Sequence, residues 1–146
     1  MTTPGNLTEA KLWQQMRTGM GRTWDASRHE DGLGVGVPDV SYGLHGVNGW
    51  IELKVRDFWP KRQNGCLRLD KLTAVQVLWL EKRGKSAGNC WVFMRIENTY
   101  LLFNWKVVRG LREKPMTPNQ FKSYADHWWE DTVDWGEFAL ALTQGE

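Results

Sequence analysis

The chemistry that this sequence could perform depends on Asp39, Glu52 and Lys54, within the stretch GVPDVSYGLHGVNGWIELKV at residues 36–55. Two β-prone runs flank the glycine- and asparagine-rich segment GLHGVNG, so the pattern predicts an antiparallel hairpin. With the turn centred on His45–Gly46, Asp39 lies opposite Glu52 across the ladder. Directly opposite residues have their Cβ atoms about 5 Å apart on one side of the sheet, so two carboxylates are expected to meet there.

Side-chain alternation puts Glu52 and Lys54 on one face of the second strand and the apolar Ile51 and Leu53 on the core face. Facing carboxylates repel each other, and a hard cation such as Mg²⁺ removes that repulsion by binding carboxylate, water and phosphate oxygens. Lys54 beside the ion could orient an attacking water or offset charge developing on phosphorus. The spacing therefore favours metal-assisted phosphodiester hydrolysis. The alternative is an exposed strand with a weak Glu–Lys salt bridge.

The same residues carry a resemblance to a known family. Pro38-Asp39, twelve intervening residues and Glu52-Leu53-Lys54 resemble the motif of the PD-(D/E)xK nuclease superfamily, which lies on such a hairpin. The resemblance is strongest to the virus-type replication-repair (VRR-NUC) nucleases and to the phage and archaeal Holliday-junction resolvases. It extends over about residues 9–105, because one predicted helix precedes the hairpin and another follows it.

The resemblance implies a role for several of these residues. Asp39 and Glu52 correspond to metal ligands, with the backbone carbonyl of Leu53 as a third, and the metal would be Mg²⁺ or Mn²⁺. Lys54 corresponds to the catalytic lysine. Glu9 corresponds to an acidic residue of the first helix that assists the metal site directly or through water, although a glutamate in a first helical turn also suits the helix dipole.

Residues outside the motif have competing explanations. Gln76 resembles a helical glutamine near such active sites and is a candidate DNA contact, yet it is equally ordinary on a partly exposed helix. Arg28 could reach a phosphate and Glu30 could join the acidic site, whereas a salt-bridged edge strand explains both. His45 is interpreted as a solvated turn residue. The glycines at 32–36 lead into a strand, so they favour a tight bend or close approach of a DNA backbone, and no nucleotide cofactor is expected.

Charge is unevenly distributed around the net value of +2. Residues 117–146 contain six acidic side chains and one lysine, whereas residues 56–71 contain five basic and two acidic ones. A basic body with an acidic end is typical of a protein that meets a polyanion on one face, although a solvated loop has the same composition. The candidate phosphate contacts are Arg28, Arg56, Lys61, Arg62, Arg68 and Lys71.

The chain of 146 residues contains ten tryptophans. Most should lie in the core, because a tryptophan buries a large apolar ring. Trp59 in the basic loop is the candidate for stacking on a base, with packing against the protein as the favoured alternative. Near the C-terminus, a further aromatic group forms either a dimer interface or a cap on the core: Trp128, Trp129, Trp135 and Phe138.

Hydrophobic periodicity predicts a single mixed α/β (α+β) domain over residues 1–146, with a small mixed central sheet flanked by helices in the order α-β-β-β-α-β-β-α. The resemblance identifies it as a restriction-endonuclease-like core. The predicted helices cover residues 8–20 with Thr8 as N-cap, 70–83 with Leu72, Val75 and Trp79 as its apolar stripe, and a C-terminal stretch from about Asn119. The predicted strands lie within residues 22–30, in the hairpin, and on either side of an Asn98–Thr99 turn, and residues 56–69 form a loop.

Other classes of protein are disfavoured. The apolar runs are far shorter than the roughly 20 residues that span a bilayer, and no secretory signal is visible. Cys66 and Cys90 lack metal-binding spacing, and two cysteines do not make a disulfide framework. We therefore expect a cytoplasmic protein with no membrane partner, in the host-cell cytoplasm if it is viral.

The sequence thus predicts a Mg²⁺- or Mn²⁺-dependent DNA endonuclease, structure-selective on branched DNA in the manner of a Holliday-junction resolvase. In-line attack of a metal-activated water is the expected mechanism, and two paired cuts require a two-fold homodimer. Three alternatives stay open: a monomeric nuclease that trims flaps or ends, a non-catalytic DNA-binding module with the same fold, and a small protein whose partner is another protein.

Overall fold

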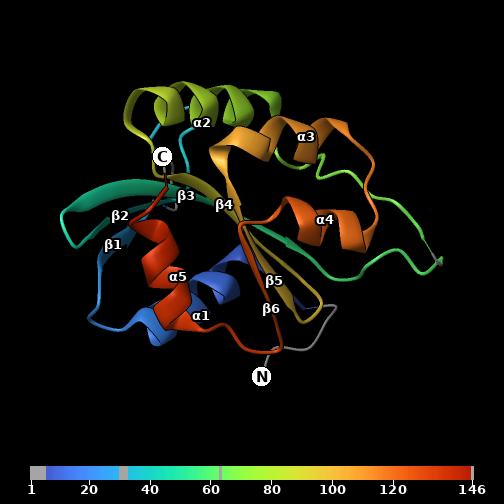
Figure 1. The fold of residues 1–146 in the computed structure, drawn as a ribbon, viewed down its shortest axis with the longest axis horizontal. Coiled ribbons are helices and arrows are strands. Elements are labelled where there is room, and N and C mark those ends of the chain that lie inside the picture. The colour runs from blue at the N-terminus through green and yellow to red at the C-terminus, as the bar shows by residue number, and fades with distance from the viewer. Residues whose placement is uncertain (1–5, 30–32, 63, 146) are drawn as a thin grey trace.

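The computed structural model describes residues 6–29, 33–62 and 64–145. A six-stranded sheet crosses this part of the chain in the order β1-β2-β3-β4-β5-β6 (Figure 1). Neighbouring strands are antiparallel except β3 and β4, which are parallel and joined through helix α2. The strands are β1 (Asp25–Arg28), β2 (Val40–Leu44), β3 (Val47–Arg56), β4 (Cys90–Ile96), β5 (Thr99–Asn104) and β6 (His127–Glu130).

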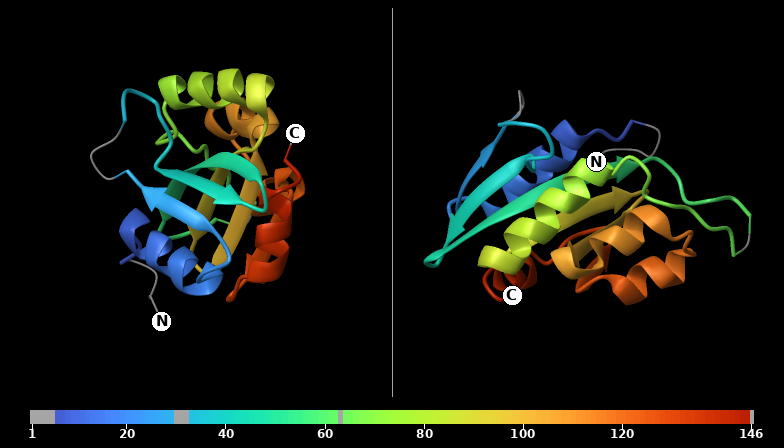
Figure 2. Two further views of the ribbon diagram at one scale, coloured as in Figure 1. Left: turned by 90° about the vertical axis from the view of Figure 1, so that its left-hand side faces the viewer. Right: turned by 90° about the horizontal axis from the view of Figure 1, so that it is seen from above.

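Helices cover both faces of the sheet (Figure 2). On one face α1 (Glu9–Met20) and α5 (Trp135–Leu142) pack over Ile51 and Leu53. On the other, α2 (Ala74–Ala87), the short 3₁₀ turn η1 (Trp105–Val107), α3 (Val108–Glu113) and α4 (Pro118–Tyr124) pack over Val92 and Phe103. The middle strands are therefore buried on both sides. No helix of the described chain is long and apolar enough to cross a membrane.

The β2–β3 hairpin has the predicted register. Val40 pairs with Ile51 and Leu44 with Val47, so the turn is centred on His45–Gly46. Both turn residues have positive φ, 50° and 81°, as a two-residue type I′ turn requires. Asp39, directly before β2, is thereby placed opposite Glu52.

Helix α1 also follows its prediction. The Thr8 hydroxyl accepts a hydrogen bond from the Lys11 N–H at 3.1 Å, which caps the helix at its first turn. The apolar face is buried through Leu12, Trp13, Met16 and Met20. Gly21, with φ of 53°, ends the helix through a bond from its N–H to the Arg17 carbonyl.

The predicted apolar stripe of α2 is wrong. The helix begins at Ala74 because Thr73 caps it, and its buried residues are Val77, Leu80 and Gly84. Leu72 is buried before the helix starts, whereas Val75 is 44% exposed. Val75 lies two residues before Val77, about 200° away around the helix axis, and therefore faces away from the buried side.

The single C-terminal helix predicted from about Asn119 is also wrong. Helix α4 ends at Tyr124, β6 then pairs with β5 through Tyr100 and Trp129, and α5 follows. Trp129 and Phe138 are buried and Trp135 packs against their cluster, whereas Trp128 is 44% exposed. Most of the aromatic group therefore caps the core, and the acidic end of the chain is part of the sheet.

Candidate active site

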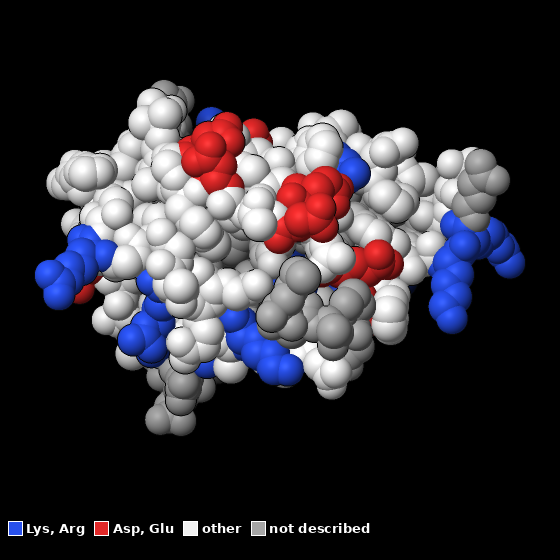
Figure 3. All heavy atoms as spheres, turned by 90° about the horizontal axis from the view of Figure 1, so that it is seen from below, with Lys and Arg blue, Asp and Glu red and all other residues white. Residues whose placement is uncertain are grey.

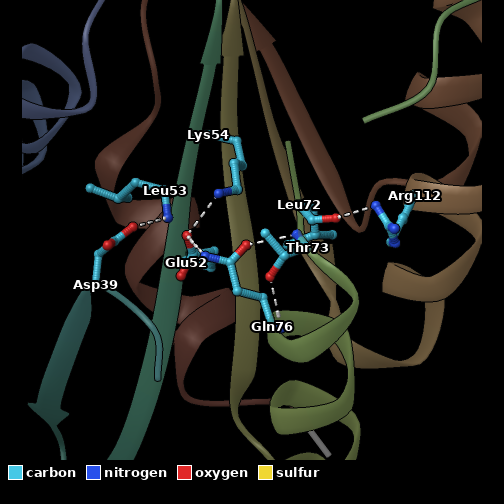
Figure 4. A network of polar contacts seen from close by, with 8 residues as sticks. All are labelled: Asp39, Glu52, Leu53, Lys54, Leu72, Thr73, Gln76 and Arg112. Atoms are coloured by element: carbon cyan, nitrogen blue, oxygen red, sulfur yellow. Dashed lines mark hydrogen bonds and ion pairs between the residues drawn. The ribbon is translucent and has the colours of Figure 1, made fainter. Parts of the chain in front are cut away.

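Glu52 lies at the centre of the candidate site, on the part of β3 that is covered from both faces. It is only 1% exposed. Its Oε2 accepts a hydrogen bond from Gln76 Nε2 at 3.2 Å and pairs with Lys54 Nζ at 3.0 Å (Figure 4). Its Oε1 is buried and has no hydrogen-bond partner within the described chain. One oxygen of this carboxylate is therefore committed to the protein and the other is not.

Asp39 is held beside Glu52 by the backbone. Its Oδ2 accepts the N–H of Leu53 at 3.0 Å (Figure 4). Its own carbonyl accepts the N–H of His29 at 2.7 Å. These bonds fix the aspartate between β1 and β3 immediately before β2 begins. The predicted meeting of the two carboxylates is thus observed.

Burial dominates the electrostatics of the site. The pKa of Glu52 is raised to about 8: burial raises it most, Lys54 lowers it and the Asp39 carboxylate raises it. Lys54 is itself 6% exposed, so the ion pair is enclosed in protein. A cation near the uncommitted oxygen would favour the ionised carboxylate.

Glu9, the first residue of α1, is half-buried and faces the same charges. Burial raises its pKa, which Lys54, Arg28 and Lys71 lower and Asp39 raises. The effects of Lys54 and Asp39 on the pKa of Glu9 show that Glu9 lies near the charges of the hairpin, as predicted.

The fit of a metal ion rests on two carboxylates. Among residues 6–29, 33–62 and 64–145, no group of three His, Cys, Asp or Glu side chains could hold a metal ion. Asp39 and Glu52 are therefore the two candidate ligands, and a role of Glu9 at the metal site stays a prediction. The pair still suits Mg²⁺, which keeps several waters and takes one or two carboxylates with substrate phosphates. The unpartnered Glu52 Oε1 is the oxygen that such an ion would satisfy.

Gln76 connects α2 to the site. Its Oε1 accepts the Thr73 N–H at 2.9 Å and its N–H donates to Thr73 Oγ1 at 3.1 Å, which completes a capping box. The remaining amide nitrogen donates to Glu52. The DNA contact expected of Gln76 stays a prediction; within the protein its side chain bonds to Thr73 and Glu52 and so orients the glutamate.

Arg112 supports the same region and was not predicted. Its Nη1 donates to the carbonyl of Leu72 at 3.2 Å (Figure 4). The same nitrogen donates to the carbonyl of Asp70 at 3.2 Å, and the two bonds fix the segment before α2. It lies on α3, a helix that the sequence pattern did not reveal, and no local signal marks it.

The predicted phosphate contacts fall into two groups. Arg28 is the last residue of β1, and its charge lowers the pKa of Glu9. The charge of the exposed Lys71 lowers the same pKa. Lys71 and Arg56 also line a pocket of about 470 Å³ at the end of β3. Arg28 and Lys71 therefore act on the acidic site, and Arg56 shares a pocket with Lys71.

The other basic residues, Lys61, Arg62 and Arg68, are exposed on the segment after β3. The first part of that segment extends furthest from the sheet in Figure 1. Figure 3 shows Lys and Arg side chains at this projecting end and acidic side chains nearer the middle of the face.

Three other expectations have structural outcomes. Trp59 packs against Phe121, with ring centroids 5.8 Å apart, so the packing alternative holds. His45 is exposed in its turn, as interpreted. Gly36, with φ of 81°, lies where a Cβ would meet Val75 at 2.7 Å, so its close approach is to α2. Glu30 and Gly32 lie outside the described residues.

Comparison with solved structures identifies the fold. The chain matches Hjc, a Holliday junction resolvase from the archaeal hyperthermophile Archaeoglobus fulgidus, with a TM-score of 0.56 and 18% identity over 89% of this chain and 98% of that one. This confirms the predicted restriction-endonuclease-like fold class. No protein-family model matches the chain, and no curated protein matches it.

Proposed function

We propose that this chain, which has the fold of a Holliday junction resolvase, is a metal-dependent DNA endonuclease that cuts branched DNA. The observation that carries the proposal is the buried Glu52 carboxylate, with one unpartnered oxygen beside Asp39 and Lys54. Burying a second carboxylate next to an ionised one is unfavourable unless a cation compensates. The arrangement is therefore expected where a cation and an anionic substrate bind.

Mg²⁺ or Mn²⁺ is the proposed cofactor, with Asp39, Glu52 and the Leu53 carbonyl as ligands and Glu9 acting through water. When bound, the ion would supply Lewis-acid activation of water and neutralise phosphate charge. Lys54 places its ammonium where negative charge develops on phosphorus, and its ion pair with Glu52 fixes it there. Gln76 holds the glutamate from the other side.

DNA binding is proposed to follow the basic residues on either side of the site. Arg28, Arg56 and Lys71 would contact phosphates near the cut, and the exposed loop cations would contact an arm of the junction. Such contacts position DNA without reading sequence and make binding steeply dependent on salt. Resolution of a four-way junction by two paired cuts would require a two-fold dimer. The resemblance to virus-type replication-repair nucleases stays a prediction.

One observation favours a second candidate, a DNA-binding module that does not cut. Lys54 and Gln76 already satisfy one oxygen of Glu52. In this candidate Lys54 balances the charge of Glu52, and the chain keeps the fold and binds DNA without cutting it.

Cleavage of a labelled four-way junction, compared with a linear duplex of matched sequence, tests the proposal. Wild type, Glu52→Gln and Lys54→Ala are compared in Mg²⁺ and in EDTA, with Glu113→Gln as a control at an exposed carboxylate on α3. We expect metal-dependent cutting of the junction by wild type and the control, with a loss of at least about 100-fold in both site variants while binding persists. Binding without cutting in either Mg²⁺ or Mn²⁺ would make the chain a recognition module. Preference for a flap over the junction would indicate a trimming nuclease.

A further inference from the structure

The face of the sheet that carries Glu52 continues beyond the candidate active site. Ladder partners place Asp25, Gly43 and Asn48 in one row across β1, β2 and β3. The next row is Ser27, Ser41 and Trp50.

The row after that contains His29, Asp39 and Glu52, because the backbones of His29 and Asp39 are hydrogen-bonded and residues two apart share a face. The carboxylates are therefore the last of three rows on one surface. The polar residues of the first two rows are its direct continuation.

Little of the described chain covers these first two rows. In the described part of the chain, the hydrophobic core on this side of the sheet contains no residue of β1 or β2. Among the described residues of the two rows, Trp50 is the one that packs against this core. Asp25, Ser27 and Asn48 are exposed. A pocket of about 340 Å³ lies over the rows and is lined by these three residues together with Ser41 and Trp50.

The far wall of this surface is aromatic and basic. Trp50 and Trp79 meet edge to face with ring centroids 5.2 Å apart. The Arg83 guanidinium lies over both rings, 4.6 Å from the centroid of Trp79 and 5.7 Å from that of Trp50. Arg83 is exposed and forms no ion pair with any described carboxylate. A guanidinium held over aromatic rings keeps N–H donors that can bind an anion.

We propose that this face, hereafter the nucleotide face, binds one unpaired nucleotide of the DNA substrate beside the scissile phosphate. The base would lie in the pocket against Trp50, and its flanking phosphate would meet Arg83. This inference rests on the proposed nuclease function. An unpaired base is required, because a base that is stacked and paired in a duplex can neither stack on Trp50 nor present its Watson–Crick edge to this pocket. Branch points and flaps supply such bases.

The chemistry of the pocket suits a base better than a second phosphate. The Asp25 carboxylate repels phosphate but accepts a hydrogen bond from an exocyclic amino group, as in cytosine or adenine. Asn48 and Ser27 each supply a donor and an acceptor. Thymine has no amino group and offers only its N3–H, which lies between two carbonyl oxygens that repel a carboxylate, so Asp25 should disfavour it. Stacking on an aromatic ring is tolerant of sequence, which leaves Asp25 as the source of selectivity.

Cleavage rates measure this selectivity. Junctions that carry each of the four bases next to the mapped cut, on either side, are compared for wild type and Asp25→Ala, with Glu113→Ala as the control. We expect wild type and the control to cut the thymine substrate at least about five-fold more slowly than the cytosine substrate. The difference should disappear in Asp25→Ala.

Binding provides a readout that does not depend on cutting. A junction with fluorescent 2-aminopurine at the same position is bound by the Glu52→Gln protein in EDTA, with and without Ser27→Ile. Isoleucine fills the pocket and is favoured in a strand, so this variant should fold, and thermal unfolding checks that it does. We expect 2-aminopurine fluorescence to change on binding to Glu52→Gln, and the change to be lost with Ser27→Ile. Arg83→Ala should lower the salt slope by about one, whereas Lys114→Ala should not.

The outcomes separate the two proposals. Equal cutting of all four bases, with a fluorescence change that survives Ser27→Ile, overturns the nucleotide face and leaves the nuclease standing. A wild type that never cuts, with a fluorescence change lost in Ser27→Ile, retains the nucleotide face and overturns the nuclease. Dissociation of a dimer by Ser27→Ile would make this face a contact between copies of the chain and would overturn the inference.

Discussion

Leu53 and Asp39 are joined by a hydrogen bond from the Leu53 N–H to Asp39 Oδ2, 3.0 Å long. Because Leu53 follows Glu52 in β3, this bond sets the position of one carboxylate from the backbone that carries the other. The Leu53 side chain is fully buried in the core, so the backbone at this point is well anchored. The two acidic groups are thus placed by the hairpin itself.

Gln76→Ala should reduce both stability and activity. It removes half of the capping box of α2 and takes away the amide that donates to Glu52, and each loss costs about 1 kcal/mol. Chemical denaturation and junction cleavage measure the two effects.

Gln120→Ala is the matched control for that change. Gln120 forms the same capping box with Thr117 at the start of α4, and its hydrogen bonds stay within that cap and its own helix. It should therefore lose the cap stability alone and keep full activity. Equal losses of activity in the two variants would mean that the contact with Glu52 does not position the carboxylate.

The stability of the metal-free protein should fall as pH rises. The pKa of Glu52 is about 8 in the folded chain against an ordinary value of 4.5, so between these values the folded state binds a proton that the unfolded state lacks. Stability from this group is full below pH 4.5 and is lost as pH rises through 8. The slope from this group approaches about 1.4 kcal/mol per pH unit within the window.

Denaturant titrations in EDTA across this pH range test the expectation. Glu52→Gln should flatten the profile and be more stable than wild type at the alkaline end, whereas Glu113→Gln should keep the wild-type slope. A wild-type profile as flat as that of Glu52→Gln would show that the buried carboxylate stays ionised throughout.

Mg²⁺ should stabilise the folded protein at alkaline pH. At ten times the dissociation constant, a ligand that binds only the folded state adds about 1.4 kcal/mol. The rise in melting temperature should be lost in Glu52→Gln and in Asp39→Asn, and scanning calorimetry with and without the ion measures it. An equal rise in these variants would place the ion elsewhere.

Gly84→Ala should destabilise the protein although it lies within α2. A Cβ at this position would overlap the indole of Trp105, which packs on the helix, and overpacking of this kind costs about 1–3 kcal/mol. Gly110 in α3 has open space, with Lys114 3.9 Å from the position of a Cβ. Gly110→Ala should therefore stabilise by about 0.5–1 kcal/mol. Thermal unfolding of both variants decides the sign.

The hairpin could be predicted because its signals are local. Turn residues at His45–Gly46 and strict alternation along β3 determine which side chains share a face, and the register follows from the turn. The first helix was predictable for the same reason, from its cap at Thr8 and its apolar spacing.

The remaining features depend on contacts between distant segments. The four residues of β6 are a strand because they pair with β5, and nothing in HWWE distinguishes them from a helix. The contacts of Arg112 and the proposed nucleotide face each combine residues from several elements, so neither has a signature at one place in the chain. Gln76 was recognised, but its bond to Glu52 required the position of α2 over β3.

The Arg112 clamp has a consequence for how the chain could be altered. It holds the carbonyls of Asp70 and Leu72, and the capping box at Thr73 then restarts the helix at a fixed residue. Because Arg112 binds main-chain carbonyls, this contact does not depend on which side chain residue 70 carries. A change of length or composition in the upstream segment, which carries Lys61 and Arg62, would leave the position of Gln76 unchanged. The projecting loop could therefore be exchanged for another while Glu52 and Gln76 kept their positions.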